Sequence, residues 1–313
     1  MCRPSPFINT AGRRGKEQYM NQVAFIGLGA MGLPMASNLL AARFPVAGFD
    51  MNPQALAALR QAGGRACDSA RDAAAGADAL VLMVVNAAQA EQVLFEDGAL
   101  EALADEAVVV LMATCPSAVV TRLAERVRRA GRQLVDAPVS GGVVGARAGT
   151  LSIMTAAPAA IFERIAPVLR AMGDKVFHVG EEPGQGAVVK TVNQLLCGVH
   201  IAAVAEAFSL ARKAGVDLQV LLEIMSGSAA SSWMLKDRGP RMLRDDPEVT
   251  SAIDIFVKDL GIVLASGSDS RAALPLAAAA HQMFLATAGR GLGQADDSQV
   301  IQSYDLINGN RQA

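Results

Sequence analysis

Short, continuous apolar runs alternate with helical patterns in the first half of the chain. A strand that is apolar on both sides is typical of a parallel sheet covered by helices on both faces. The segments between the runs predict helices, some with charges on one face. The pattern therefore predicts an α/β fold with a doubly wound, mainly parallel sheet. The apolar runs cover residues 23–26, 46–49, 79–85, 108–112 and 133–137.

The second half of the chain shows only helical periodicity. Residues 187–214 form one long, mostly apolar helical pattern, which at 1.5 Å per residue would be about 40 Å long. A helix of that length can connect two domains. We therefore expect an α/β domain over 21–184 and an all-helical domain over 185–308, joined by this long interdomain helix. Residues 1–20 predict a disordered extension and 309–313 a tail.

A glycine motif follows the first apolar run directly. It has the form G-x-G-x-x-G, and a helical pattern and a second apolar run ending on Asp50 come after it. Its first glycine allows a sharp turn, the second leaves room for a pyrophosphate, and the third lets helix and strand pack closely. Free N–H groups at the helix start favour phosphates. The alternative is a glycine-rich turn without a ligand. The predicted dinucleotide contacts are Gly27, Leu28, Gly29, Ala30, Met31 and Gly32.

Asp50 bears on the choice of cofactor. Its carboxylate can accept hydrogen bonds from both hydroxyls of an adenosine ribose, and it would repel the 2′-phosphate of NADP. Residues 51–54 supply no Arg or Lys to neutralise such a phosphate. The sequence therefore predicts NAD. Ligands of doubly wound sheets bind beyond the carboxyl ends of the strands, where Val85, Asn86 and Thr114 also fall.

The composition excludes several classes of function. The 313 residues are 52% hydrophobic and 19% charged, with a formal net charge of −2 and no basic patch that would indicate nucleic acid. Four cysteines without close spacing predict neither a metal site nor disulfides, which favours reduced thiols in a cytoplasm. No uncharged apolar run is long enough for a membrane span. Residues 1–19 lack the apolar core of a secretory signal.

Two further stretches carry candidate chemistry. Ser140, Gly141 and Gly142 follow a strand, and their N–H groups and hydroxyl could hold a carboxylate, although an ordinary turn is the alternative. Lys190 lies on an apolar helix with Asn193 and Gln194 on its own face. Partial burial would lower the pKa of this lysine and suit it to proton transfer. The alternative is a lysine that reaches water from the first helical turn.

Two features of the helical half are open to a plainer interpretation. Trp233 is expected in the core rather than in a substrate wall. Asp254 and Lys258 stand four residues apart and predict a surface pair, with a location in a cleft as the alternative.

In combination these motifs resemble the β-hydroxyacid dehydrogenase family over about residues 22–307. The resemblance rests on the glycine loop, Asp136 to Gly142, Gly186 to Gln194 and Lys258-Asp259-Leu260, in that order. It implies that Lys190 is the general acid/base and that Ser140, Gly141 and Gly142 bind the substrate carboxylate. It also implies that Asn193 helps to hold the substrate, and that Thr114 and Lys258 lie against the cofactor.

The same resemblance implies a small hydroxy or sugar acid as substrate and a homodimer or homotetramer formed through the helical domain. A finer likeness points to a branch that oxidises the C2 hydroxyl of a four-carbon sugar acid with NAD. One departure is Gln194, where the family commonly has Asn. Branches acting on 3-hydroxyisobutyrate or tartronate semialdehyde remain alternatives, as does a catalytically silent scaffold, although scaffolds of this kind lose the lysine.

Overall fold

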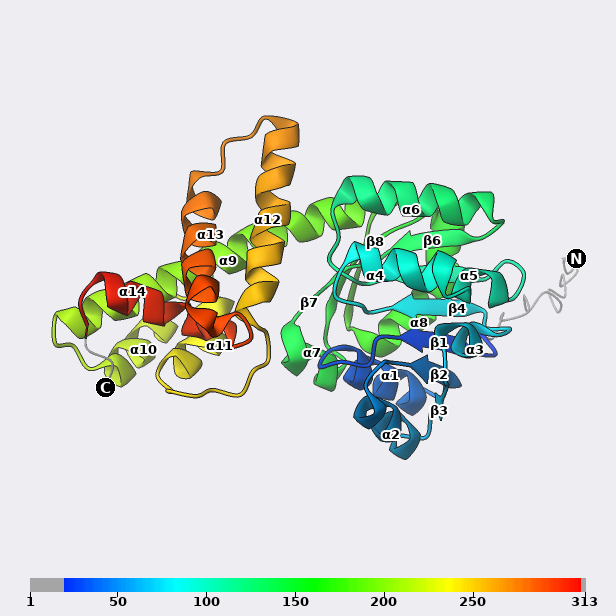
Figure 1. Ribbon diagram of the computed structural model, residues 1–313, viewed down its shortest axis with the longest axis horizontal. Coiled ribbons are helices and arrows are strands. Elements are labelled where there is room, and N and C mark those ends of the chain that lie inside the picture. Colours follow the sequence, from blue (N-terminus) through cyan, green and yellow to red (C-terminus); the bar gives the residue numbers. More distant parts are fainter. Residues whose placement is uncertain (1–19, 311–313) are drawn as a thin grey trace, which may run out of the picture.

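The computed structural model describes residues 20–310, so residues 1–19 of the predicted extension and 311–313 of the predicted tail lie outside the described residues. Figure 1 shows a sheet-containing half and a purely helical half, with α9 running through both. This is a Rossmann-like, mainly parallel sheet followed by helices, as the hydrophobic pattern predicts.

The sheet has neighbour order β3-β2-β1-β4-β5-β6-β8-β7 within the described residues, and β9 pairs with β8. The strands from β1 to β6 pair in parallel, whereas β8 is antiparallel to both β6 and β7. The apolar runs 23–26 and 108–111 are fully buried because helices cover both faces. The strands are β1 (Val23–Ile26), β2 (Val46–Phe49), β3 (Arg65–Ala66), β4 (Ala79–Leu82), β5 (Val108–Leu111), β6 (Gln133–Asp136), β7 (Val139–Ser140), β8 (Ser152–Ala156) and β9 (Lys175–Gly180).

Two hydrophobic layers separate the sheet from its helices. Met35, Leu39 and Phe162 belong to one layer, and Leu94, Leu123 and Val127 to the other. Alternate side chains of each central strand enter opposite layers, which fixes the sheet between them. The covering helices are α1 (Gly32–Ala41), α2 (Pro53–Gln61), α3 (Ala70–Ala74), α4 (Ala87–Glu91), the π-helical η1 (Gln92–Glu96), α5 (Ala99–Ala102), α6 (Ser117–Arg129), α7 (Gly142–Ala148) and α8 (Ala159–Met172).

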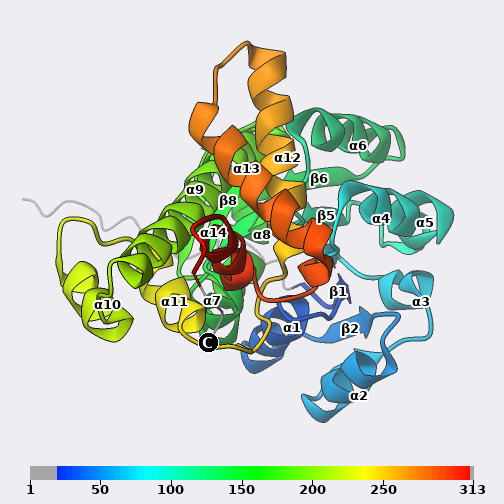
Figure 2. The same ribbon diagram turned by 60° about the vertical axis from the view of Figure 1, so that its left-hand side comes forward.

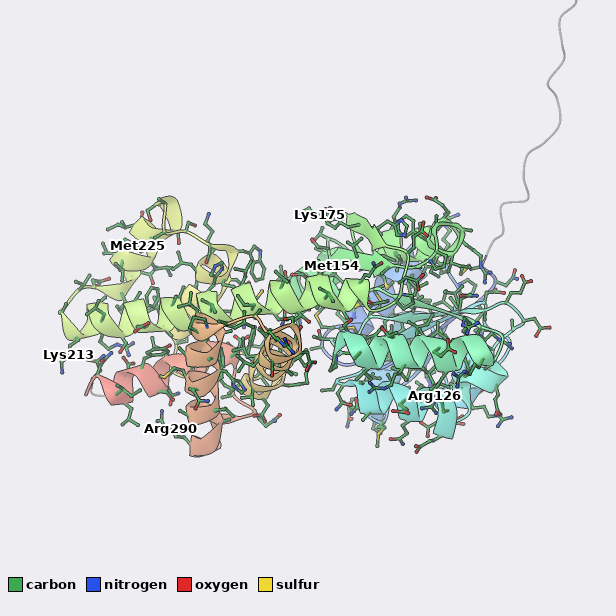
Figure 3. The ribbon with its side chains drawn as sticks, turned by 90° about the horizontal axis from the view of Figure 1, so that it is seen from above. Arg126, Met154, Lys175, Lys213, Met225 and Arg290 are labelled. Atoms are coloured by element: carbon green, nitrogen blue, oxygen red, sulfur yellow. The ribbon has the colours of Figure 1, made fainter. Side chains whose placement is uncertain are left out.

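The long helix α9 (Gln185–Lys213) connects the halves, and Figure 3 shows it from above with Lys213 at its far end. Its start is fastened to the sheet by Asp136 at the end of β6. Asp136 Oδ2 accepts the N–H groups of Gly184 and Ala187, each at 2.8 Å. Within residues 20–310, α9 is the one helix long and apolar enough to span a membrane, but 50% of its most apolar window is buried, as in a core helix.

The remaining helices pack around the second part of α9. Figure 2 shows α12, α13 and α14 stacked in front of it, and Phe208, Phe256 and Phe284 lie in their common core. These elements are α10 (Leu218–Gly227), α11 (Trp233–Met242), α12 (Ile253–Ser270), α13 (Pro275–Thr287), the π-helical η2 (Ala288–Leu292), the 3₁₀ helix η3 (Asp297–Val300) and α14 (Ile301–Ile307).

Some local details differ from the sequence prediction. The apolar run 79–85 forms a strand only to Leu82, because the chain then turns towards α4. The short strand β7 and the helix α7 occupy a stretch for which a turn was the alternative interpretation. The strand β3 has only two residues and carries no apolar run that would reveal it.

Candidate active site

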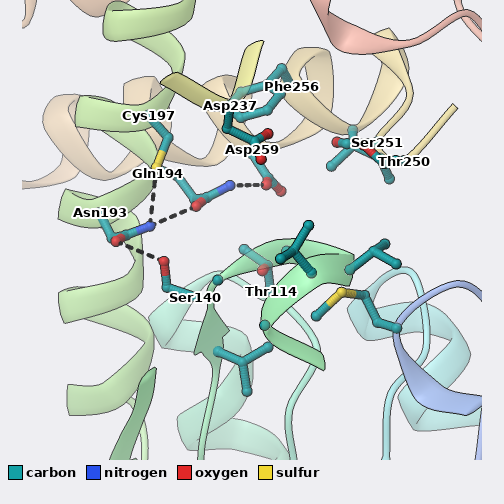
Figure 4. Close-up of a pocket in the computed structure, with 18 of the residues that line it drawn as sticks. Thr114, Ser140, Asn193, Gln194, Cys197, Asp237, Thr250, Ser251, Phe256 and Asp259 are labelled. Carbon is teal, nitrogen blue, oxygen red and sulfur yellow. Dashed lines mark hydrogen bonds between the residues drawn. The ribbon is translucent and has the colours of Figure 1, made fainter. Parts of the chain in front are cut away.

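A cavity of about 1170 Å³ opens between the two halves, and Figure 4 shows part of its lining. The glycine loop and the ends of the strands form one wall. The first turns of α9, together with α11 and α12, form the other. Most of the predicted site residues therefore meet in one place. They are Gly29, Ala30, Met31, Gly32, Val85, Thr114, Ser140, Gly141, Gly142, Lys190, Asn193 and Lys258.

The glycine turn has the geometry that a dinucleotide requires. Gly27 has φ +92°, and a Cβ there would lie 2.4 Å from the Met83 carbonyl oxygen. A Cβ at Gly32 would lie 1.8 Å from the Gly27 carbonyl oxygen, so helix and turn are in close contact. Above Gly29, by contrast, a Cβ would meet nothing within 4 Å. The turn thus leaves open the one position where a pyrophosphate approaches, and the residues fit NAD.

Four predicted cofactor contacts do not line this cavity: Gly27, Leu28, Asp50 and Asn86. Asp50 instead supports the turn, because its Oδ2 accepts the Leu28 N–H at 2.6 Å. Asn86 caps α4 by accepting the Gln89 N–H at 2.9 Å. Its side chain is therefore already used for local structure.

The loop after β7 combines a hydroxyl with unusual backbone geometry. Gly141 has φ +128° and Gly142 φ +59°, which side-chain-bearing residues rarely adopt. A Cβ at Gly142 would meet nothing within 4 Å. Ser140 Oγ donates to Asn193 Oδ1 at 3.3 Å, so the loop faces α9. The arrangement can accommodate a small anion between the loop and the helix.

Lys190 is buried, with 7% of its surface exposed, rather than reaching water. Its Nζ donates to Gln194 Oε1 at 2.7 Å. Burial lowers the pKa of Lys190, while the negative charge of Asp259 acts in the opposite direction. A lysine held in this way can exist as a neutral amine closer to neutral pH than a free lysine.

Of the two interpretations of Asp254 and Lys258, the structure agrees with the cleft location of Lys258 and not with a surface pair. Lys258 lies in the cavity, where its Nζ donates to Asp259 Oδ1 at 2.5 Å and to the Thr114 carbonyl oxygen at 3.4 Å. Asp254 accepts from Gln294 instead. Lys258 therefore joins α12 to the sheet edge across the cavity.

Part of the helical wall could not be predicted from the sequence. Trp233 is 51% exposed and lines the cavity, so its expected core position is wrong. Asp237 lines the same wall, and its Oδ2 accepts hydrogen bonds from Arg238 and Arg241. Arg238 in turn binds Asp297 through two hydrogen bonds of 2.8 Å. Partners about sixty positions apart leave no local sequence signal.

No group of three or more His, Cys, Asp or Glu residues in the described part of the chain could hold a metal ion. Burial raises the pKa of the Cys115 thiol to about 12 and that of Cys67 to about 11, so these thiols stay protonated and unreactive at neutral pH.

Two family models together match nearly the whole described chain. The model described as the NAD binding domain of 6-phosphogluconate dehydrogenase matches residues 22–180. The model described as "NAD-binding of NADP-dependent 3-hydroxyisobutyrate dehydrogenase" matches residues 184–304. The junction between the two falls at the start of α9.

Curated relatives and solved structures are similar along almost their full length. L-threonate dehydrogenase from Cupriavidus necator is 43% identical over 91% of this chain and 96% of the relative. The L-threonate dehydrogenase from Escherichia coli is 42% identical over 91% of this chain and 95% of the relative. A crystal structure of 3-hydroxyisobutyrate dehydrogenase from Salmonella typhimurium has a TM-score of 0.86 and 41% identity, and covers 90% of this chain and 99% of its own.

Proposed function

The chain belongs to the β-hydroxyacid dehydrogenases and has an NAD-binding domain, and we propose that it oxidises L-threonate at C2 to the 2-oxo acid. The observation that carries the proposal is the meeting of glycine turn, Ser140 loop and Lys190 in one cavity. NAD, when bound, accepts the hydride from the hydroxyl-bearing carbon.

Lys190 is the general acid/base of this proposal. Loss of a hydride from an alcohol carbon requires loss of the hydroxyl proton, and a neutral amine can accept it. The ammonium form returns the proton in the reverse direction. Burial of Lys190 supports this role, because desolvation favours the neutral amine that serves as the base.

The substrate carboxylate is assigned to the loop of Ser140, Gly141 and Gly142. The open space above Gly142 and the positive φ of Gly141 and Gly142 support this placement. Asn193 extends from α9 to the same loop and is assigned to hold the substrate between them. Thr114 and Lys258 form the side of the cavity assigned to the nicotinamide end of the cofactor.

The choice of L-threonate rests on the similarity to L-threonate dehydrogenases, and the polar helical wall supports it. The hydroxyls at C3 and C4 of a sugar acid need polar partners. Asp237, Thr250 and Ser251 supply them along the cavity. The alternative substrates are 3-hydroxyisobutyrate and tartronate semialdehyde. The similarity to a solved 3-hydroxyisobutyrate dehydrogenase supports the first of them. A silent scaffold is disfavoured by the buried lysine.

The working form proposed is a cytoplasmic homo-oligomer. Residues 21–184 would be its dinucleotide unit and 185–308 the unit for substrate and subunit contacts. The free thiols of the described cysteines, Cys67, Cys115 and Cys197, are compatible with a cytoplasm. Exposed apolar side chains on the helical half, Leu210 and Ile224 among them, support subunit contacts there.

A substrate panel tests the proposal. NADH formation would be followed with L-threonate, D-threonate, D- and L-erythronate, 3-hydroxyisobutyrate, L-serine and D-glycerate. We expect the highest kcat/KM for L-threonate. If kcat/KM is highest for 3-hydroxyisobutyrate, that acid is the substrate instead of L-threonate. Binding of NAD without turnover of any acid would favour the silent scaffold.

Replacement of Lys190 tests the mechanism. General acid–base catalysis contributes about 10²–10⁴-fold, so Lys190→Ala and Lys190→Met should lower kcat by at least about 100-fold. Lys190→Arg should lower kcat as well, because a guanidinium remains protonated and cannot act as the base. Binding of NADH, measured by fluorescence titration, should be retained. Near-normal turnover by a folded Lys190→Ala variant would exclude Lys190 as the base.

A further inference from the structure

Lys190 is held through a single acceptor. Its Nζ donates to Gln194 Oε1 at 2.7 Å, and it makes no other hydrogen bond to residues 20–310. Both residues lie on α9, one helical turn apart, and both are buried. The direction of the Gln194 amide therefore decides what Lys190 meets.

The direction of that amide is fixed from the other side. Gln194 Nε2 lies 2.5 Å from Asp259 Oδ2, and the second oxygen of Asp259 accepts from Lys258 Nζ at 2.5 Å. A carboxylate only accepts hydrogen bonds, so the amide must present its NH₂ group to Asp259. Its oxygen then faces Lys190. Asp259 is 2% exposed, so water does not compete for this contact.

An oxygen facing Lys190 has a consequence for the base. Neutral lysine has N–H donors and one lone pair, and only an N–H can interact with an acceptor. The lone pair is then left free to take the substrate proton. A reversed amide would donate its own N–H to that lone pair and block it.

We propose that Asp259, acting through Gln194, is a positioning residue that keeps the Lys190 lone pair open to the substrate hydroxyl. The proposal rests on the proposed role of Lys190 as base. The fixed amide of Gln194 also orients the substrate loop, because Gln194 Oε1 accepts a hydrogen bond from Asn193 Nδ2 at 2.9 Å. Asn193 then turns its own oxygen to Ser140 Oγ. Figure 4 shows this chain of contacts from Ser140 to Asp259.

The charged and titratable groups of the cavity around Lys190 come from three helices and one strand. Those that act on the pKa of Lys190 are Cys197 on α9 and Asp259 and Lys258 on α12. The cavity also contains His200 on α9, Asp237, Arg238 and Arg241 on α11, and Lys175 on β9. Of these, Asp259 favours the ammonium form of Lys190 and Lys258 disfavours it. Without the negative charge of Asp259, the ammonium form of Lys190 loses its stabilising partner and the positive charge of Lys258 is unopposed. Both effects lower the pKa of Lys190.

The test compares pH profiles of kcat for L-threonate oxidation in the wild type, Asp259→Asn, Gln194→Met and the double variant. We expect Asp259→Asn to move the rising limb down by about one pH unit, since nearby opposite charges shift a pKa by about 1–3 units. Its plateau kcat should fall at least about tenfold. Gln194→Met should give a similar loss with KM for NAD unchanged, because it leaves the ion pair of Lys258 with Asp259 in place. Asp254→Asn, on α12 but outside the cavity, is the matched control and should behave like the wild type.

The double variant tests whether Asp259 acts on Lys190 through Gln194. If Asp259 acts through Gln194, the loss of kcat from Asp259→Asn is at least threefold smaller in the Gln194→Met background than in the wild type. Independent, multiplicative losses would overturn the proposal, and so would an unchanged plateau kcat in Asp259→Asn. If Asp259→Asn does not fold, a Gln194→Met variant with wild-type kcat and pH profile overturns it. Normal turnover by Lys190→Ala would instead overturn the proposed function.

Discussion

The carboxylate of Asp50 links the glycine turn to the start of α2. One oxygen accepts the Leu28 N–H at 2.6 Å and the other accepts the Asn52 N–H at 2.8 Å. Its negative charge is thereby fixed beside the glycine turn, at the end of β2, where the ribose of a dinucleotide binds. A 2′-phosphate there would meet a carboxylate and no cation from residues 51–54.

Replacing Asp50 with Ser and Asn52 with Arg should therefore shift preference towards NADP. The substitutions remove the repelling charge and add a guanidinium for the phosphate. The ratio of kcat/KM for NAD to that for NADP should exceed about 10 in the wild type, and fall by at least tenfold in the variant. The single Asn52→Arg change is the control for the added charge alone. Equal use of both cofactors by the wild type would contradict the assignment.

At the scale of elements, the contact between β6 and α9 is pH-dependent. Burial raises the pKa of Asp136 to about 6, although the N–H groups of Ala187 and Gly184 favour its charged form. The folded protein thus binds this proton more tightly than the unfolded chain does. Stability from this group is full below the unfolded pKa of about 4 and is lost as pH rises through about 6.

Asp136→Asn removes this titration and keeps an oxygen that can accept the same N–H groups. The free energy of unfolding of the wild type, relative to that of the variant, should increase by about 1 kcal/mol between pH 7.5 and pH 5. Urea unfolding at the two pH values measures the difference. A difference between the two proteins that stays constant with pH would show that the Asp136 carboxyl does not titrate in this range.

The hydrophobic pattern was sufficient for the central strands, because burial on both faces leaves continuous apolar runs, and for α9, whose helical pattern continues over 29 residues. It could not reveal β3 or β7, which have two residues each and are set by neighbouring strands. The same limit applies to the site. The glycine turn and Lys190 have local signatures. The Trp233 wall and the contact of Gln194 with Asp259 depend on packing between distant helices, which a single sequence does not encode locally.

At the scale of the whole molecule, the helical half has a cavity of about 590 Å³ between α9 and α10, lined by Leu210 among others, and Ile224 is a further exposed apolar residue of α10. Leu210 is 66% exposed and Ile224 56% exposed. If this surface joins subunits, as proposed, Leu210→Asp and Ile224→Asp should weaken assembly, because a charge would be buried at the contact. Light scattering should give an oligomer for the wild type and a smaller species for these variants. Leu276→Asp, at an exposed site outside this cavity, is the control; a wild-type monomer would contradict the proposal.

The position of Lys190 within α9 has a consequence for recombining such enzymes. The lysine lies in the second turn of the helix, directly after the turn that Asp136 holds to the sheet. A chimera spliced at Gly184 would therefore inherit its acid/base group from the donor of the helices. A chimera spliced beyond Gly198 would keep the lysine with the glycine turn and exchange only the far wall of the cavity. The useful crossover for changing substrate thus lies inside the long helix, several turns past the boundary between the two halves.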